Sequence, residues 1–178
     1  MDINYLLWLQ NFRNSINDAW TPFMEFVSTF ATRYLILAVL FIYWAVNKKR
    51  GLFAISSMCL TLAVNQLVKL TACVYRPWIR DSRIVPAGDS ITSATGYSFP
   101  SGHTQSSVGI FGAFARWHNR LWVRITGIAI CVLVPLSRMY LGVHTPADVL
   151  VSVVIALILI FGLYPLIQKC FDNTKVMR

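Results

Sequence analysis

The sequence predicts an all-α protein, a polytopic transmembrane helix bundle of five to six membrane helices with an interfacial N-terminal helix. Hydrophobic residues fill 56% of the 178 positions, charged residues fill only 13%, and the mean hydropathy is +0.58. This composition is far more apolar than that of a soluble globular domain. The lysines and arginines lie in short clusters between long apolar runs, as membrane-topology signals do. We therefore expect a multi-pass protein whose main partner is the membrane bilayer.

The apolar runs give the order of the membrane segments. Residues 1–20 mix Leu, Phe and Trp with Asn, Arg and Asp, which suits a helix lying in the membrane interface. The second span should end near Arg76, because Pro77 disfavours helical geometry at the residue before it. The fifth span has nineteen residues, which at ~1.5 Å each just cover a hydrocarbon layer of ~30 Å. Four spans are expected at residues 23–46, 51–75, 121–140 and 149–167, and a short third span is expected to start near Ser101 to His103 and to end before Arg116.

Two polar segments complete a single integral-membrane domain, residues 1–178. Residues 78–99 are rich in Gly, Pro, Ser, Thr and Asp and form a loop long enough to be a lid or a mouth. Residues 168–178 form a polar, basic tail. The four cysteines are widely spaced, without a CxxC pair, which is typical of free thiols.

The distribution of positive charge predicts the orientation. The net charge is +9, but because the cations fall between apolar runs we expect no nucleic-acid partner. By the positive-inside rule, the side with most cations, including the tail, is cytoplasmic, and the loop 78–99 is outside. The nine cations of the cytoplasmic side are Lys48, Lys49, Arg50, Arg116, Arg120, Arg124, Lys169, Lys175 and Arg178.

The segment from Ser137 to Asp148, SRMYLGVHTPAD, carries the most informative polar residues. Arg138 closes one apolar run, and His144 and Asp148 precede the next. The four-residue spacing of His144 and Asp148 would place both on one helical face, where the carboxylate could orient the imidazole and make its other nitrogen a better nucleophile. The alternative is a helix start with Thr145 as N-cap and Asp148 as a capping acid.

Two further groups of polar residues are candidates for binding an anion. Lys69 and Arg76 are seven apart, which would place both cations on one helical face, although snorkelling to the interface would also explain Arg76. Pro100-Ser101-Gly102-His103 precedes an apolar run and predicts a helix start, whose unpaired N–H groups attract anions. Every helix has such a start, so this signal alone is weak.

The predicted topology brings these groups together. Alternating spans place the end of the second, the start of the third, the end of the fourth and the start of the fifth at one membrane face. Three cations, a helix N-terminus and two histidines fit phosphoryl transfer, in which charge stabilisation and positioning provide most of the rate. Only one carboxylate, Asp148, belongs to the set, so we expect no metal site and no cofactor.

These residues carry a resemblance. The series Lys69-x₆-Arg76-Pro77, Pro100-Ser101-Gly102-His103 and Ser137-Arg138-x₅-His144-x₃-Asp148 resembles the three-part signature of the type 2 phosphatidic acid phosphatase superfamily. By size and span pattern the chain is similar to small bacterial members that act on lipid phosphates and undecaprenyl pyrophosphate. The usual core of the family has six spans, whereas five spans and an interfacial N-terminal helix are counted here. This difference affects the placement of the amino terminus but not the site.

The resemblance implies a role for each residue. His144 would be the nucleophile that becomes phosphohistidine, Asp148 its orienting partner and His103 the general acid. The phosphate would be held by Lys69, Arg76, Ser101, Gly102 and Arg138.

The expected function is therefore metal-independent hydrolysis of a phosphate monoester or pyrophosphate of a membrane lipid, of the phosphatidic acid, phosphatidylglycerophosphate or undecaprenyl pyrophosphate type. The site would face the periplasm or cell exterior from the cytoplasmic membrane. A lipid phosphotransferase with the same phosphohistidine is the alternative, and a vanadate peroxidase or a non-enzymatic transporter with buried charges is a weaker one.

Overall fold

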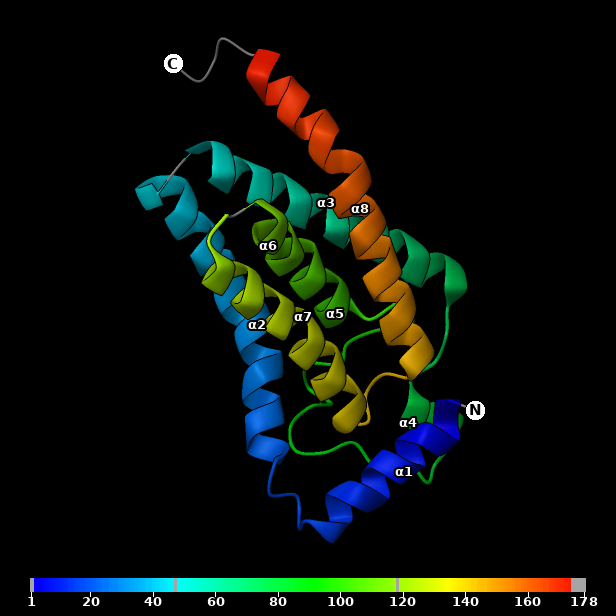
Figure 1. Cartoon of the computed structure of the whole chain (residues 1–178). Coiled ribbons are helices and arrows are strands. Elements are labelled where there is room, and N and C mark those ends of the chain that lie inside the picture. The colour runs from blue at the N-terminus through cyan, green and yellow to red at the C-terminus, as the bar shows by residue number, and fades with distance from the viewer. Residues whose placement is uncertain (1, 47, 118, 174–178) are drawn as a thin grey trace.

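The computed structural model describes residues 2–46, 48–117 and 119–173, and these ranges contain helices and loops but no strand (Figure 1). The prediction of an all-α fold is confirmed. The elements are α1 (Asp2–Ser15), α2 (Thr21–Phe41), the π-helical turn η1 (Ile42–Val46), α3 (Lys48–Ala72), α4 (Pro77–Arg80), α5 (Gly102–Ser107), the π-helical turn η2 (Val108–Gly112), α6 (Ala113–Trp117), α7 (Leu121–Tyr140) and α8 (Pro146–Asn173).

The membrane segments agree with the apolar runs. Within the described ranges, three segments are long and apolar enough to cross a bilayer: Thr21–Ala45, Gly51–Arg80 and Leu121–Tyr140. The start of α8, Pro146–Gly162, is a shorter apolar helix. These segments match the predicted first, second, fourth and fifth spans, and the total number of spans stays a prediction.

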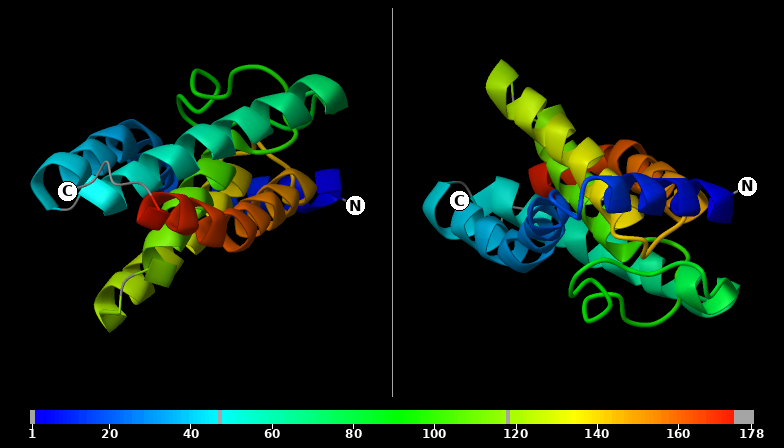
Figure 2. Two further views of the ribbon diagram at one scale, coloured as in Figure 1. Left: turned by 90° about the horizontal axis from the view of Figure 1, so that it is seen from above. Right: turned by 90° about the horizontal axis from the view of Figure 1, so that it is seen from below.

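Helices α5 and α6 with η2 form a continuous helical segment, residues 102–117, in the middle of the bundle. This segment packs against α3, α7 and α8, so the short third segment is surrounded by protein (Figures 1 and 2). Small residues allow this close packing: a Cβ on Gly109 would lie 2.8 Å from Thr61 Oγ1 of α3, and one on Gly127 of α7 would lie 2.9 Å from the Phe111 carbonyl oxygen. Close backbone approach through small residues is typical of helix packing in membranes.

Helix α3 ends earlier than predicted. Its last residue is Ala72, and Cys73 has a left-handed φ of 48° while its N–H donates to the Lys69 carbonyl at 3.1 Å. This αL residue stops the helix before the proline does. Arg76 is extended and precedes α4. The prediction that Lys69 and Arg76 share one helical face was therefore wrong.

Helix α8 begins at Pro146, three residues before the predicted span, and continues to Asn173. The predicted tail, residues 168–178, is thus helical through Asn173. Residues 174–178, including the predicted cytoplasmic cations Lys175 and Arg178, lie outside the described residues.

Helix α1 lies across the end of the bundle where α7 ends and α8 begins (Figure 1). Leu6 is buried, whereas Tyr5, Trp8 and Phe12 form an exposed aromatic row, as expected for a helix at a membrane interface. The helix ends at Ser15, short of the predicted residue 20.

The predicted loop, residues 78–99, begins inside the short helix α4, so the loop proper is residues 81–101. We keep the name outer loop for it from its predicted side of the membrane, which stays a prediction. Contacts with α1 and α2 hold this loop. From α1, the buried Arg13 donates to the Val85 carbonyl at 2.8 Å. From α2, Glu25 accepts the Asp89 N–H at 2.6 Å, and a Cβ on Gly88 (φ 52°) would collide with this carboxylate. At its far end, the Ser98 N–H donates to the Val74 carbonyl at 2.7 Å. The loop is therefore fixed where it meets the site.

Candidate active site

Arg76 is the best-connected cation of the predicted set. Its side chain is buried, and three backbone carbonyls accept its N–H groups: Gly96 from Nε at 2.9 Å, Thr95 from Nη2 at 2.8 Å and Val143 from Nη1 at 3.1 Å. Nη1 also lies 3.0 Å from Nε2 of His144. The outer loop and the α7–α8 connection thus fix the guanidinium beside the imidazole.

Asp148 lies on the other side of the imidazole. Its Oδ2 is 3.4 Å from Nδ1 of His144, and both side chains are almost fully buried. The same oxygen accepts the Ser98 hydroxyl at 2.5 Å and the Thr145 N–H at 2.9 Å, while the Asp148 N–H donates to Thr145 Oγ1 at 3.3 Å. The reciprocal bonds with Thr145 confirm that Asp148 caps α8, and its carboxylate still lies beside the imidazole, so the orienting role stays a prediction.

His144 itself does not lie on α8 but in the connection before it. The prediction that it shares a helical face with Asp148 was wrong, because the two meet through the capping turn. Burial lowers the pKa of His144, and the nearby Asp148 carboxylate opposes this effect in part. A neutral imidazole with an available nitrogen is the form that a nucleophile needs.

The start of α5 lies beside the start of α8. Ser101 is the N-cap of α5 and accepts the Thr104 N–H at 3.4 Å, while its own N–H donates to the Asp148 carbonyl at 3.3 Å. Gly102 faces α3: a Cβ there would lie 3.9 Å from Lys69 Nζ. The Lys69 ammonium is therefore close to the helix start.

His103 is partly exposed, and its ring has no hydrogen-bond partner among the residues that the structure describes. The side chains of Arg138, His144, Arg76 and Lys69 are all within electrostatic reach of this ring. Both histidines and the three predicted cations thus gather at one end of the bundle, as the alternating spans predict.

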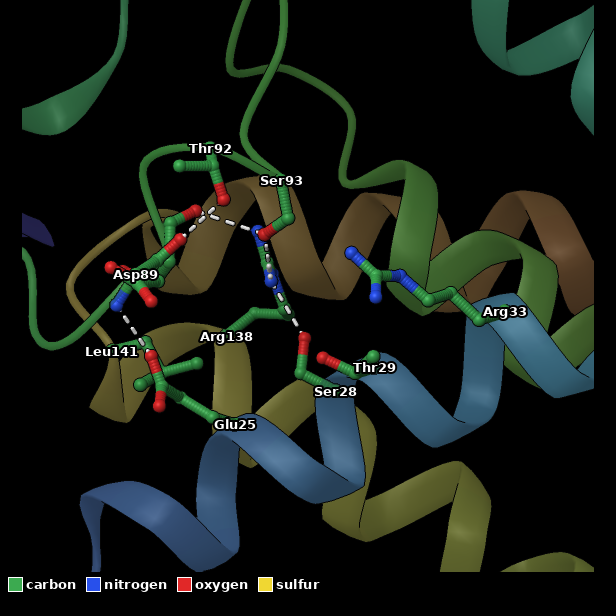
Figure 3. Close-up of a pocket in the computed structure, with 10 residues that line it drawn as sticks. Glu25, Ser28, Thr29, Arg33, Asp89, Thr92, Ser93, Arg138 and Leu141 are labelled. Atoms are coloured by element: carbon green, nitrogen blue, oxygen red, sulfur yellow. Dashed lines mark hydrogen bonds between the residues drawn. The ribbon is translucent and has the colours of Figure 1, made fainter.

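Arg138 reaches this region from α7 and is only 1% exposed. Its Nη1 donates to Ser28 Oγ of α2 at 2.6 Å and to Ser93 Oγ of the outer loop at 3.3 Å, whereas its Nε and Nη2 have no partner. Beside it lies a cavity of about 270 Å³ between α2, the outer loop and α7, which we call the α2 cavity (Figure 3). Its lining includes Glu25, Ser28, Thr29, Arg33, Ser93 and Arg138.

Several residues of this region were missed by sequence reasoning. Ser98, which binds the Asp148 carboxylate, is one of many small polar residues in the outer loop and carries no distinguishing signal. Asn65 and Gln105 form a buried amide pair, with Asn65 Nδ2 donating to Gln105 Oε1 at 2.9 Å. Asn65 stands out as polar within an apolar span, and this signal could have found the pair.

The described part of the chain holds no group of three or more His, Cys, Asp or Glu side chains suited to a metal ion. Asp148 is the only carboxylate in the set of predicted site residues, and its oxygen is engaged by Ser98 and Thr145. The expectation of metal independence stays a prediction.

Comparison with known proteins agrees with the resemblance. The model of the PAP2 superfamily matches residues 50–172, a range that contains all the predicted site residues. Phosphatidylglycerophosphatase B of Bacillus subtilis (strain 168) is 32% identical over 115 residues, which cover 59% of this chain and 52% of that protein. Undecaprenyl-diphosphatase of Sulfolobus acidocaldarius is 29% identical over 133 residues, covering 71% of this chain and 61% of that protein.

A third relative, undecaprenyl-diphosphatase BcrC of Bacillus subtilis (strain 168), is 28% identical over 145 residues, covering 78% of this chain and 72% of that protein. The matches to the first two relatives span between about half and two thirds of their length. The family match alone covers well over half of this chain. On that match, and on the three motifs gathered at one end of its helix bundle, the chain belongs to the PAP2 superfamily.

Proposed function

We propose that the protein is a metal-independent phosphatase that removes phosphate from a membrane lipid monophosphate or diphosphate through a phosphohistidine intermediate. The names of the relatives, a phosphatidylglycerophosphatase and undecaprenyl-diphosphatases, support this class of substrate. The apolar helices support access from a bilayer.

One observation carries the mechanism: the His144 ring lies between Asp148 Oδ2, 3.4 Å from Nδ1, and Arg76 Nη1, 3.0 Å from Nε2. The carboxylate selects the tautomer with the proton on Nδ1, so the lone pair is on Nε2. When substrate binds, a phosphoryl oxygen replaces Nε2 as the partner of Arg76, and Nε2 attacks phosphorus. The N–P bond forms as the bond to the leaving oxygen breaks.

His103 supplies a proton to the leaving oxygen, for which its accessible ring without a hydrogen-bond partner is suited. Water, deprotonated by the same histidine, then attacks the phosphohistidine and releases inorganic phosphate and free His144. Lys69, Arg76 and Arg138, with the N-terminus of α5 at Ser101 and Gly102, stabilise the charge on the equatorial oxygens. The two unpaired nitrogens of Arg138 are available for this contact.

A lipid phosphotransferase would use the same residues, with an acceptor hydroxyl in place of water. The partly exposed position of His103 is compatible with either acceptor. Release of inorganic phosphate without an added acceptor distinguishes the hydrolase from the transferase.

The test is a substrate panel with purified protein in detergent and EDTA present. Phosphatidic acid, phosphatidylglycerophosphate, undecaprenyl pyrophosphate and sphingosine phosphate are each incubated, and inorganic phosphate is measured. We expect release from at least one lipid, inhibition by vanadate, and loss of release in His144→Ala. Phosphate release that needs a divalent cation, or that survives His144→Ala, would overturn the proposal.

A further inference from the structure

Arg33 is a cation that the proposed mechanism does not use. It lies on α2 eight residues after Glu25, which places it about 12 Å further along the helix axis. Arg33 therefore lies near the middle of Thr21–Ala45, an apolar segment that is long enough to cross a bilayer. An ionisable residue at such a depth is costly unless a partner or a ligand uses its charge.

The polar residues of α2 form a stripe. Glu25, Ser28, Thr29 and Arg33 follow the spacing of one helical face, and all four line the α2 cavity. On the other faces Phe26, Phe30, Tyr34 and Leu37 are exposed, as expected for contact with lipid. Arg33 therefore lies on the face of α2 that lines the cavity. Figure 3 shows its guanidinium directed toward Arg138.

Neither carboxylate of the cavity neutralises Arg33. Glu25 is occupied by the Asp89 N–H at 2.6 Å, and Arg33 makes no ion pair with any residue that the structure describes. In Figure 3, Glu25 and Asp89 lie on one side of Arg138 and Arg33 lies on the other. Two guanidinium groups therefore share one part of the cavity without a protein anion between them.

Arg138 connects the α2 cavity with the phosphate site. It is 1% exposed, lines the cavity, and keeps two nitrogens, Nε and Nη2, without a partner. Buried guanidinium nitrogens are rarely left unpaired unless a ligand completes them. The hydroxyl groups of Ser28 and Ser93, which Arg138 contacts, add donors beside it.

We propose that the α2 cavity is a second anion subsite, in which Arg33 binds a second phosphate group of the substrate while the phosphoryl group that is transferred lies at His144. The inference rests on the proposed function. The second anion can be the phosphate next to the scissile bond in a lipid diphosphate, or the phosphodiester of phosphatidylglycerophosphate. In a diphosphate, Nε2 of His144 attacks the terminal phosphorus, and the lipid monophosphate leaves with the proton of His103. Arg33 offsets the charge of that leaving group.

The test compares lipids that have a second anion with one that lacks it. The kcat/KM of wild type, Arg33→Gln and Arg33→Lys is measured on undecaprenyl pyrophosphate, on phosphatidylglycerophosphate and on phosphatidic acid. The ratio of kcat/KM on a two-anion lipid to kcat/KM on phosphatidic acid should fall by about tenfold or more in Arg33→Gln, for at least one of the two-anion lipids. Arg33→Lys should recover part of this ratio. The matched control is Arg80→Gln, an exposed cation at the same end of the bundle, which should leave the ratio unchanged.

A binding measurement complements the kinetics. Methylenediphosphonate has two anionic groups and cannot be hydrolysed at its bridge, whereas orthophosphate has one. Arg33→Gln should weaken inhibition by methylenediphosphonate about tenfold more than inhibition by orthophosphate. Three results would overturn the subsite. They are equal losses by Arg33→Gln on all substrates and inhibitors, no loss by this variant on either two-anion lipid, and a wild type that accepts only phosphatidic acid. A wild type that hydrolyses none of the lipids would instead contradict the proposed function.

Discussion

At the scale of residues, Asp148 both caps helix α8 and lies beside the imidazole of His144. Its Oδ2 accepts a hydroxyl from Ser98 and an N–H from Thr145, and it lies 3.4 Å from Nδ1 of His144. The capping bonds hold the carboxylate in place without removing it from the imidazole. A fixed carboxylate is what a buried histidine needs to keep one tautomer.

We predict that Asp148→Asn lowers kcat by about 100-fold or more with a small change in KM. A neutral amide stabilises neither the charged form of the His144 imidazole nor its orientation as the carboxylate does. Steady-state kinetics on the best lipid of the panel measure this effect. A variant with unchanged kcat would contradict the orienting role.

Two buried serines provide a matched comparison for the same carboxylate. Ser98 donates to the Asp148 carboxylate, whereas Ser152 donates to the Asp148 backbone carbonyl at 2.6 Å. Ser98→Ala should reduce kcat by about tenfold, since a hydrogen bond to a charged group is lost, while Ser152→Ala should stay within about twofold. Equal effects of the two variants would mean that Ser98 acts only through packing.

At the scale of elements, α1 fixes the outer loop through polar contacts. Arg13 is 4% exposed and binds the Val85 and Tyr140 carbonyls and the Asp18 carboxylate. Gln10 pairs with the backbone of the same loop, donating to the Arg83 carbonyl at 3.0 Å and accepting the Val85 N–H at 2.8 Å. The loop that α1 holds also supplies the carbonyls of Thr95 and Gly96 to Arg76.

We therefore predict that Arg13→Ala costs about 2–4 kcal/mol of stability and also lowers kcat, because two carbonyls lose a charged donor and the loop loosens next to Arg76. Unfolding in mixed micelles and lipid phosphatase assays measure the two effects. Arg80→Ala, which replaces an exposed cation of α4, is the control and should change neither quantity. Full activity in a destabilised Arg13→Ala would show that α1 does not position the site.

The crossing of α6 and α7 depends on one small residue. A Cβ on Gly127 would lie 2.9 Å from the Phe111 carbonyl oxygen and 3.0 Å from Ala115 Cβ, whereas a Cβ on Gly162 in α8 would meet nothing within 4 Å. Gly127→Ala should destabilise the bundle by about 1–3 kcal/mol, because backbone atoms have to move. Gly162→Ala should be neutral or stabilising by up to about 1 kcal/mol. Unfolding midpoints in mixed micelles test the pair, and equal midpoints would contradict the close crossing.

At the scale of the whole molecule, the distribution of charge predicts that the site opens outward. We expect a cysteine at Ser82, exposed in the outer loop, to react with a membrane-impermeant maleimide in intact cells. A cysteine at Asn119, exposed at the other end of the bundle, should react only after lysis. Both substitutions are made in a cysteine-free background, in which Cys59, Cys73, Cys131 and Cys170 are replaced. The reverse pattern of labelling would place the site in the cytoplasm.

The sequence alone determined the helical class, the apolar segments and the three motifs, because hydrophobic runs and short motifs are local properties of the chain. The bounds of α7 agree with the prediction, and the motif residues do meet at one end of the bundle. The predicted reasons for two of these proximities were wrong, since Lys69 with Arg76 and His144 with Asp148 do not share helical faces. An αL residue and a capping turn, which periodicity does not reveal, bring them together instead.

Only the tertiary structure decided which groups surround the motif residues. The carbonyls that fix Arg76 and the hydroxyl that binds Asp148 come from the outer loop, and the serines that hold Arg138 lie on α2 and on that loop. These partners are 19 to 110 residues distant in sequence. The contacts depend on how helices cross and where a loop is tied down, and no local pattern encodes that geometry.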